Sequence, residues 1–145
     1  MIKKTIYLLF IISYLFSQIQ KEGAPKFYNN LIDDMSYISV DSDYEINRSF
    51  HPMVFQFGNE YNLSVNVLEQ SRIVENDNET TFILGIESRG AYGIGIHFSD
   101  FYLSDNSKLF FYDKDKTFII GAFNSQNNKL TNSLTTTIIK SDKVI

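Results

Sequence analysis

The sequence predicts an all-β protein, an antiparallel β-sandwich of jelly-roll-like type, and three features lead to that prediction. The chain has 13 Phe and 9 Tyr against 3 Met and no Trp, and aromatic residues are enriched in strands. Apolar residues alternate with small or polar ones along several segments. Clusters of Asp, Asn, Ser and Gly separate these segments at the spacing of turns between antiparallel strands.

Length, charge and cysteine content narrow the classes of function. A chain of 145 residues suits one ordinary domain. Its net charge of −4 gives a nucleic-acid role no electrostatic support. The absence of cysteine excludes a disulfide framework, a thiolate zinc site and a cysteine nucleophile.

Residues 1–17 have the pattern of a secretory signal peptide. Lys3 and Lys4 precede a twelve-residue, largely apolar run, and Ser17 supplies a small residue for cleavage. A membrane anchor is the rival interpretation, but the run is shorter than the roughly 20 residues that span a bilayer. We therefore expect a secreted or periplasmic protein, free of the membrane after cleavage. Losing two of the 13 basic and none of the 17 acidic residues changes the net charge from −4 to −6.

Residues 18–50 are expected to form a polar, irregular N-terminal arm. Within it, residues 31–40 fit either a short helix or an edge strand, and the sequence does not decide between them. The acidic stretch 41–45 alternates as in a calcium loop, but it lacks the glycine and the terminal glutamate that such a loop requires. A solvated linker is the favoured interpretation.

The β-sandwich domain is expected to span residues 51–145. Leu63 and Val65 should face inward from one strand, and Phe82 and Leu84 from the next, with an exposed connection at 69–79 between them. The expected strands are 53–57, 62–68, 80–88, 92–98, 101–103, 108–112, 117–123, 135–140 and 143–145, the last cut short by the end of the chain.

The glycines of GAYGIGIHF, which begins at Gly90, raise the question of a phosphate-binding loop. Their spacing is the reverse of the dinucleotide fingerprint, and β-forming residues follow them instead of a helix. Tyr92, Ile94, Ile96 and Phe98 are expected to face inward on one strand. The glycines between them would permit close approach of another segment or a bend in the sheet.

Candidate residues for chemistry are few. His51 and His97 are the two histidines, and no nucleophile motif accompanies either, so ordinary structural histidines are favoured over a catalytic or metal-binding pair. DKDK, residues 113–116, fits a hairpin turn better than a metal site. We expect no catalytic residue, no cofactor and no metal. Consecutive aromatic residues on a strand face opposite ways, so Tyr102 and Tyr112 are candidate surface contacts, for sugars in particular.

From about Phe55 to the end of the chain, the order of several segments resembles a known family: a strand ending in ES, then RGAYGIGIHFSDFYL, SKLFFYDKDKT, IIGAF, NSQNNK and TTTIIKSD. It is similar to the non-catalytic N-terminal region of secreted trypsin-like serine proteases of the lysyl endopeptidase type. The resemblance implies a signal peptide, then a β-sandwich pro- or accessory domain, then a protease domain as its partner. The catalytic triad would lie beyond Ile145, so the chain is expected to be a fragment of a protease precursor and not itself an enzyme.

A secreted carbohydrate- or surface-binding module is the alternative function. It would hold polysaccharide on exposed aromatic rings such as Tyr102 or Tyr112. A stand-alone enzyme is the third and least favoured possibility, because its chemistry would depend on His51 or His97 alone.

The signal-peptide prediction is tested at the N-terminus. Intact-mass and N-terminal peptide measurements on the exported protein should find a chain that begins at Gln18. An exported chain that still begins at Met1 would contradict the prediction.

Overall fold

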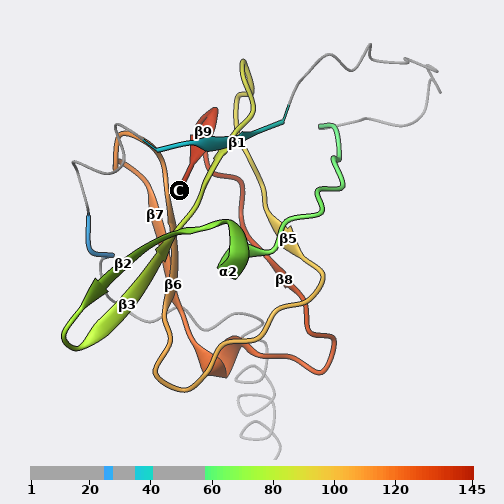
Figure 1. Ribbon diagram of the computed structural model, residues 1–145. Coiled ribbons are helices and arrows are strands. Elements are labelled where there is room, and N and C mark those ends of the chain that lie inside the picture. Colours follow the sequence, from blue (N-terminus) through green and yellow to red (C-terminus); the bar gives the residue numbers. More distant parts are fainter. Residues whose placement is uncertain (1–24, 28–34, 41–57) are drawn as a thin grey trace, which may run out of the picture. The chain divides into compact units, whose positions relative to one another are not determined.

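A computed structural model describes residues 25–27, 35–40 and 58–145. These residues contain nine strands and a single four-residue α-helix, so the all-β prediction is confirmed, while the sandwich architecture stays a prediction (Figure 1). The expected signal peptide, the acidic stretch 41–45, His51 and the expected strand at 53–57 lie outside the described residues. The elements are β1 (Tyr37–Ser39), α2 (Val67–Gln70), β2 (Arg72–Asn76), β3 (Glu79–Ile83), β4 (Gly85–Glu87), β5 (His97–Phe98), β6 (Leu109–Tyr112), β7 (Ile119–Phe123), the 3-10 turn η2 (Ser125–Asn127), β8 (Leu134–Thr135) and β9 (Lys143–Val144).

The described residues divide into two units. Unit 1 contains His97–Phe110 and Ile120–Thr135. Unit 2 contains the described part of Lys26–Ile96, together with Phe111–Ile119 and Thr136–Ile145. The expected strands at 108–112 and 117–123 are confirmed as β6 and β7, which pair as a two-stranded sheet.

The main sheet of unit 2 is formed by β4 between β1 and β9. β1 runs parallel to β4, with Tyr37 opposite Gly85, and β9 runs antiparallel to it, with Val144 opposite Ile86. Of the two possibilities for residues 31–40, the described part, residues 35–40, has the edge strand, β1 at Tyr37–Ser39. The side chains of Ile83, Tyr112 and Ile145 form a buried cluster, and those of Met35, Tyr37 and Val74 pack against it.

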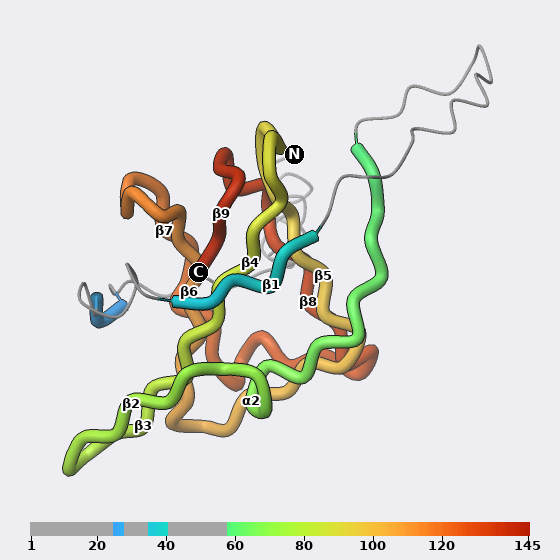
Figure 2. The backbone as a smooth tube through the Cα atoms, turned by 45° about the horizontal axis from the view of Figure 1, so that its top comes forward, coloured from blue at the N-terminus to red at the C-terminus, as the bar shows by residue number. Residues whose placement is uncertain are grey.

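The segment at 69–79 is mostly exposed, as expected, but it is not a plain connection: most of it belongs to the hairpin β2–β3 (Figures 1 and 2). A two-residue turn, Asp77–Asn78, joins the strands, as in the commonest hairpins. The sequence does not predict β2, because its apolar residues Ile73 and Val74 are adjacent and charged residues flank them. Apolar and polar residues therefore do not alternate as they do in a half-buried strand.

The strand expected at 62–68 is also not formed. Leu63 is 44% exposed, and α2 begins at Val67 instead. The side chain of Asn66 accepts a hydrogen bond from the Leu68 backbone N–H at 3.1 Å and so caps the helix. Asparagine is among the residues best suited to this position.

The inward face predicted for the strand at 80–88 is shifted by one residue. Ile83 is 6% exposed and packs in the core, whereas Phe82 is 43% exposed. A shift of one position moves a side chain to the opposite face of a strand. The physical reason is the break at Leu84, because β3 and β4 are separate strands with different partners.

The glycine-rich segment packs as the close-approach interpretation required. Ile94 and Ile139 exchange two backbone hydrogen bonds of 2.9 Å each. A Cβ on Gly93 would lie 2.6 Å from Ile138 Cγ2 and 3.0 Å from the Ile139 carbonyl oxygen. Ile94, Ile96 and Phe98 are half-buried as expected, but the expectation for Tyr92 is wrong because its side chain is fully exposed.

Unit 1 is organised by the antiparallel pair β5–β8, in which His97 lies opposite Thr135. Phe101, Phe123 and Leu134 are buried. The loop after β7 begins with η2, where the Asn124 side chain accepts from the Gln126 backbone N–H at 2.9 Å. The amide side chains of this loop thus hold its backbone by hydrogen bonds.

The tight contact at Gly93 leads to a stability prediction. Replacing Gly93 by Ala should lower the free energy of unfolding by about 1–3 kcal/mol, because a methyl group there collides with Ile138 and the Ile139 carbonyl. Gly95→Ala is the matched control, since its Cβ would meet only Ile138 Cγ1 at 3.8 Å. Urea unfolding of both variants measures the difference, and equal stabilities would contradict the packing described.

Candidate binding surfaces

Tyr102 lies on a short segment of unit 1 whose backbone is fixed on both sides. The Phe101 N–H donates to the Asn132 carbonyl oxygen at 2.6 Å. The Asn128 side chain accepts from the Leu103 N–H at 2.9 Å and donates to the Leu103 carbonyl oxygen at 2.8 Å. Phe101 is 4% exposed and Tyr102 is 76% exposed, so this aromatic pair divides between core and surface as predicted. The phenol ring is therefore displayed from an ordered support.

A second apolar side chain projects from the opposing segment. The Asn132 N–H donates to the Lys129 carbonyl oxygen at 3.0 Å, which closes a turn with Leu130 near its tip. Leu130 is fully exposed. The hydrogen bonds of residues 101 and 103 to residues 132 and 128 align the two segments, so Tyr102 and Leu130 come from neighbouring stretches of backbone. Each is exposed, so unit 1 carries an exposed aromatic ring and an exposed aliphatic side chain on these two stretches.

Tyr112 does not join this surface, and the prediction that it is exposed is wrong. Its side chain is 5% exposed, and its ring meets that of Phe27 edge-on with centroids 5.3 Å apart. Burial, together with the nearby Tyr37 hydroxyl, raises the pKa of Tyr112 to about 12, so the phenol stays neutral at pH 7. Phe111 beside it is buried as well, although consecutive side chains on a strand point to opposite faces and one of the two was expected to be exposed.

His97 takes part in a surface contact across β5–β8. Its Nδ1 lies 2.8 Å from Thr135 Oγ1, and both residues are exposed. Within residues 25–27, 35–40 and 58–145, no group of three or more His, Asp or Glu residues could hold a metal ion.

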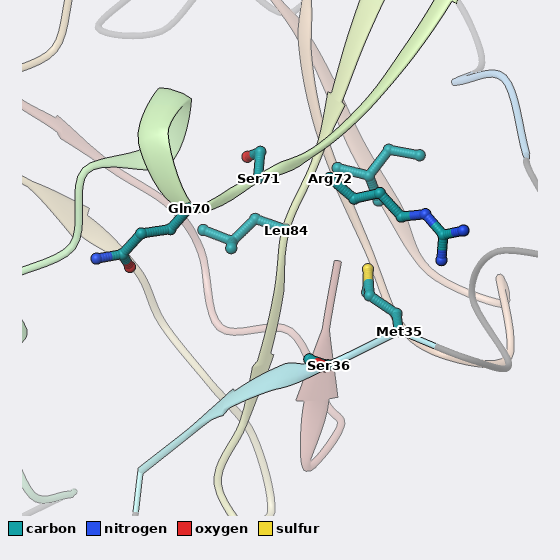
Figure 3. A pocket seen from close by; sticks show the side chains of 7 residues that line it. Met35, Ser36, Gln70, Ser71, Arg72 and Leu84 are labelled. Carbon is teal, nitrogen blue, oxygen red and sulfur yellow. The ribbon is translucent and has the colours of Figure 1, made fainter.

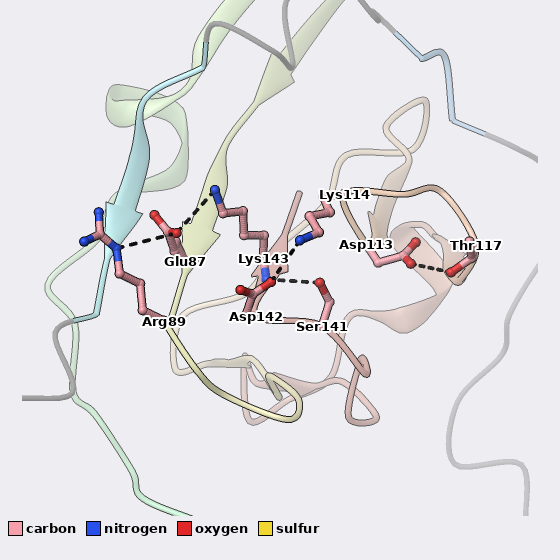
Figure 4. A network of polar contacts seen from close by, with 8 residues as sticks. All are labelled: Glu87, Arg89, Asp113, Lys114, Thr117, Ser141, Asp142 and Lys143. Atoms are coloured by element: carbon pink, nitrogen blue, oxygen red, sulfur yellow. Dashed lines mark hydrogen bonds and ion pairs between the residues drawn. The ribbon is translucent and has the colours of Figure 1, made fainter.

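Charged residues of unit 2 form a network around β4 and β9 (Figure 4). Glu87 lies between two cations, with its Oε1 3.2 Å from Lys143 Nζ and 3.7 Å from Arg89 Nε. Lys114 and Asp142 form another ion pair at 3.5 Å. Opposite charges face each other throughout, which suits a structural role in tying the strand ends together.

Asp113 organises the DKDK turn. Its buried carboxylate accepts hydrogen bonds from the Thr117 hydroxyl and, at 2.9 Å, from the Phe118 N–H. Burial alone would raise the pKa of this carboxyl, but the hydrogen bonds from Thr117 and Phe118 outweigh it, so the pKa lies below its ordinary 3.8. The interpretation of DKDK as a hairpin turn is confirmed.

The outer face of hairpin β2–β3 carries an exposed apolar pair in unit 2. Ile73 and Phe82 lie directly opposite each other, and they are 52% and 43% exposed. Val74, on the other face, packs against the core cluster. Cross-strand neighbours on one face are close enough to act as a single contact surface.

Unit 2 also contains a pocket of about 290 Å³, where the start of β1 approaches the helix and hairpin (Figure 3). It combines apolar side chains with hydroxyl, amide and guanidinium groups. Its lining consists of Met35, Ser36, Gln70, Ser71, Arg72, Ile83 and Leu84. The sequence does not reveal this site, because residues 35–36 come from far along the chain to meet the hairpin and no motif marks the lining.

Comparison with known proteins finds no matching family model, curated protein or solved structure. Among the residues that the structure describes, no helix is long and apolar enough to cross a membrane.

The low pKa of Asp113 predicts acid sensitivity. Because the folded state favours the ionised carboxylate, its stabilisation is present above pH 3.8 and is lost as the pH falls through the lowered pKa. Asp113→Asn should therefore reduce stability at pH 7 by about 1–3 kcal/mol and have less effect at acid pH. Urea midpoints at pH 7 and pH 3 measure this, with the exposed Asp115→Asn as control. A loss for Asp113→Asn that is the same at both pH values would contradict the assignment.

Proposed function

We propose that the chain is a non-catalytic pro- or accessory domain of an exported trypsin-like serine protease of the lysyl endopeptidase type. It acts by packing against the protease domain, to assist that domain's folding or to restrain its activity. The order of segments from Arg89 to Asp142 supports this family, and the pattern of residues 1–17 supports export. No covalent chemistry is assigned to the chain.

The observation that carries the proposal is the apolar outer face of hairpin β2–β3. Ile73 and Phe82 together offer an aliphatic and an aromatic group on a support whose opposite face is anchored in the core. Protein interfaces concentrate their binding energy in a few such side chains near the centre of the contact. A pro-domain needs a surface of this kind, since it works by shape and burial.

The test uses the isolated catalytic domain of a lysyl endopeptidase, refolded separately, as the binding partner. Ile73→Ala and Phe82→Ala should each weaken its binding to the chain by about tenfold or more, as measured by biolayer interferometry. Leu130→Ala, in unit 1, is the control because it removes an exposed apolar side chain elsewhere. Failure of the unaltered chain to bind the protease domain would sink the proposal, and equal losses in all three variants would exclude the hairpin face.

A carbohydrate-binding module is the second candidate, and the exposed ring of Tyr102, between two residues whose backbone is hydrogen-bonded, favours it. Sugar rings stack on aromatic faces through their C–H groups, while hydroxyl groups need amide, hydroxyl and carboxylate partners. Near Tyr102 in sequence, Asp105 and Asn106 are exposed, and Asn132 lies beside its backbone.

Affinity electrophoresis in gels that contain soluble polysaccharide tests this second candidate. The unaltered chain should be retarded, and Tyr102→Ala should restore most of its mobility because the stacking face is lost. Tyr92→Ala is the control, since Tyr92 is also an exposed tyrosine but belongs to unit 2. Retardation that survives Tyr102→Ala, or no retardation at all, would reject Tyr102 as a sugar platform.

A further inference from the structure

The tip of hairpin β2–β3 carries the motif of an N-glycosylation acceptor. Asn78, Glu79 and Thr80 form the sequon Asn-x-Thr, in which the middle residue is not proline. Such a motif is frequent by chance in a chain rich in asparagine, so its structural setting decides whether it can accept a glycan. An acceptor asparagine has to lie in a surface loop or turn of a secreted protein.

The backbone position of Asn78 meets this requirement. Asn78 is the second residue of the two-residue turn between β2 and β3, and it stands outside the paired register of the two strands. The turn lies at the free end of the hairpin, from which the strands lead back toward β4 (Figures 1 and 2). Residues 77–80 are all exposed. Exposed loop tips of this kind are readily reached by modifying and cleaving enzymes.

Thr80 supplies the hydroxyl of the motif on the open face of β3. Side chains alternate between the two faces of a strand, so Thr80 shares its face with Phe82, which is 43% exposed. Ile83, on the other face, is buried. Among the residues that the structure describes, no hydrogen bond or ion pair engages the side chain of Asn78 or of Thr80. The amide and the hydroxyl are therefore both accessible.

The middle residue of the sequon does not compete for either group. The Glu79 carboxylate is ion-paired with Lys26 Nζ, and Glu79 lies opposite Asn76 in the strand register. Alternation along β3 directs Glu79 to the face opposite Thr80. A glycan attached while the chain is still unfolded would also be compatible with the folded hairpin, because the side chain of Asn78 is exposed.

We propose that Asn78 is an acceptor for an N-linked oligosaccharide. Its Nδ2 would attack C1 of the first sugar of a lipid-linked oligosaccharide pyrophosphate. The N–C1 bond forms, the bond between C1 and the pyrophosphate oxygen breaks, and the lipid pyrophosphate leaves with that electron pair. The proton lost from Nδ2 passes to a base of the transferase, and nothing is oxidised or reduced. The glycan would extend into solvent from the hairpin tip.

A second sequon in the described residues provides an internal comparison. Asn62, Leu63 and Ser64 are all exposed, in a segment that is neither strand nor turn. Its hydroxyl belongs to serine, which is not β-branched and therefore holds its hydroxyl in less restricted orientations than threonine does. We expect a larger fraction of molecules to be modified at Asn78 than at Asn62. A third sequon, which begins at Asn47, lies outside the described residues.

The experiment directs the full chain into the secretory pathway of a eukaryotic host behind the host's own leader, so that entry does not depend on residues 1–17. Chain recovered from the lumen and the medium is deglycosylated enzymatically in heavy-oxygen water, which converts each glycosylated asparagine to labelled aspartate. Peptide mass spectrometry then locates the label. We expect it on Asn78 in most molecules.

Two substitutions at one position form a matched pair. Thr80→Ala should abolish the label on Asn78, whereas Thr80→Ser should retain it, because only the alanine variant removes the hydroxyl that the sequon requires. Asn78→Gln should leave the urea midpoint of the unglycosylated chain unchanged, since the side chain that it replaces is exposed.

The results decide the proposal in either direction. A label on Asn78 that depends on the hydroxyl of Thr80 supports it. An unmodified Asn78 in chain recovered from the lumen, or a label confined to Asn62 or Asn47, would overturn it. Equal labelling of Asn78 in the unaltered chain and in Thr80→Ala would also overturn it, as would a lowered urea midpoint for Asn78→Gln, which would mean that the fold needs this amide. None of these measurements involves the protease domain, so they test the acceptor site independently of the proposed function.

Discussion

The backbone pairing of β4 with strands on both of its sides is the constraint on which unit 2 depends. β4 has three residues, yet it joins β1, which precedes it by nearly fifty positions, to β9, which follows it by nearly sixty. Val40 extends the first pairing through its N–H to the Glu87 carbonyl oxygen at 2.7 Å, and Ser88 extends the second to the Asp142 carbonyl oxygen at 2.8 Å. Ile145 and Tyr112 then exchange two backbone hydrogen bonds of 2.9 Å each, which places both in the core cluster.

The other features of unit 2 follow from this arrangement. The sheet fixes the start of β1 beside the hairpin, and so creates the pocket that Met35 and Ser71 share. It brings Glu87 opposite Lys143, and the lysine ammonium then lies 4.8 Å from the centre of the Tyr37 ring. These side-chain contacts are modest individually, since exposed ion pairs contribute about 0–1 kcal/mol. These contacts add a little stability to a sheet whose arrangement the backbone hydrogen bonds determine.

The sequence predicted those parts of the fold that local chemistry determines. The DKDK turn forms as expected because the Asp113 side chain closes it locally, and β6 and β7 lie on its two sides. The sequence determines less well which face of a strand is buried. Phe82 and Ile83 are both apolar, and only the partners of β3 and β4 decide which one is buried.

At the candidate surfaces, too, the sequence cannot predict burial that depends on distant residues. The exposure of Tyr102 is predicted correctly, but Tyr112 is buried through its contacts with Ile145 and Phe27, which are distant in sequence. The pocket could not be foreseen, because its lining meets only after the parallel pairing has formed.

The separation in sequence between β1, β4 and β9 also has a kinetic consequence. The hairpin β2–β3 closes through two turn residues, and such hairpins form in about 1–10 μs. The β1–β4 and β4–β9 pairings must each close a long loop first, and such non-local contacts slow folding. The hairpin is thus expected to exist before the sheet that later anchors it, with Ile73 and Phe82 already side by side on its surface. A chain that is still folding would therefore present this apolar pair at an early stage, before the rest of unit 2 has assembled.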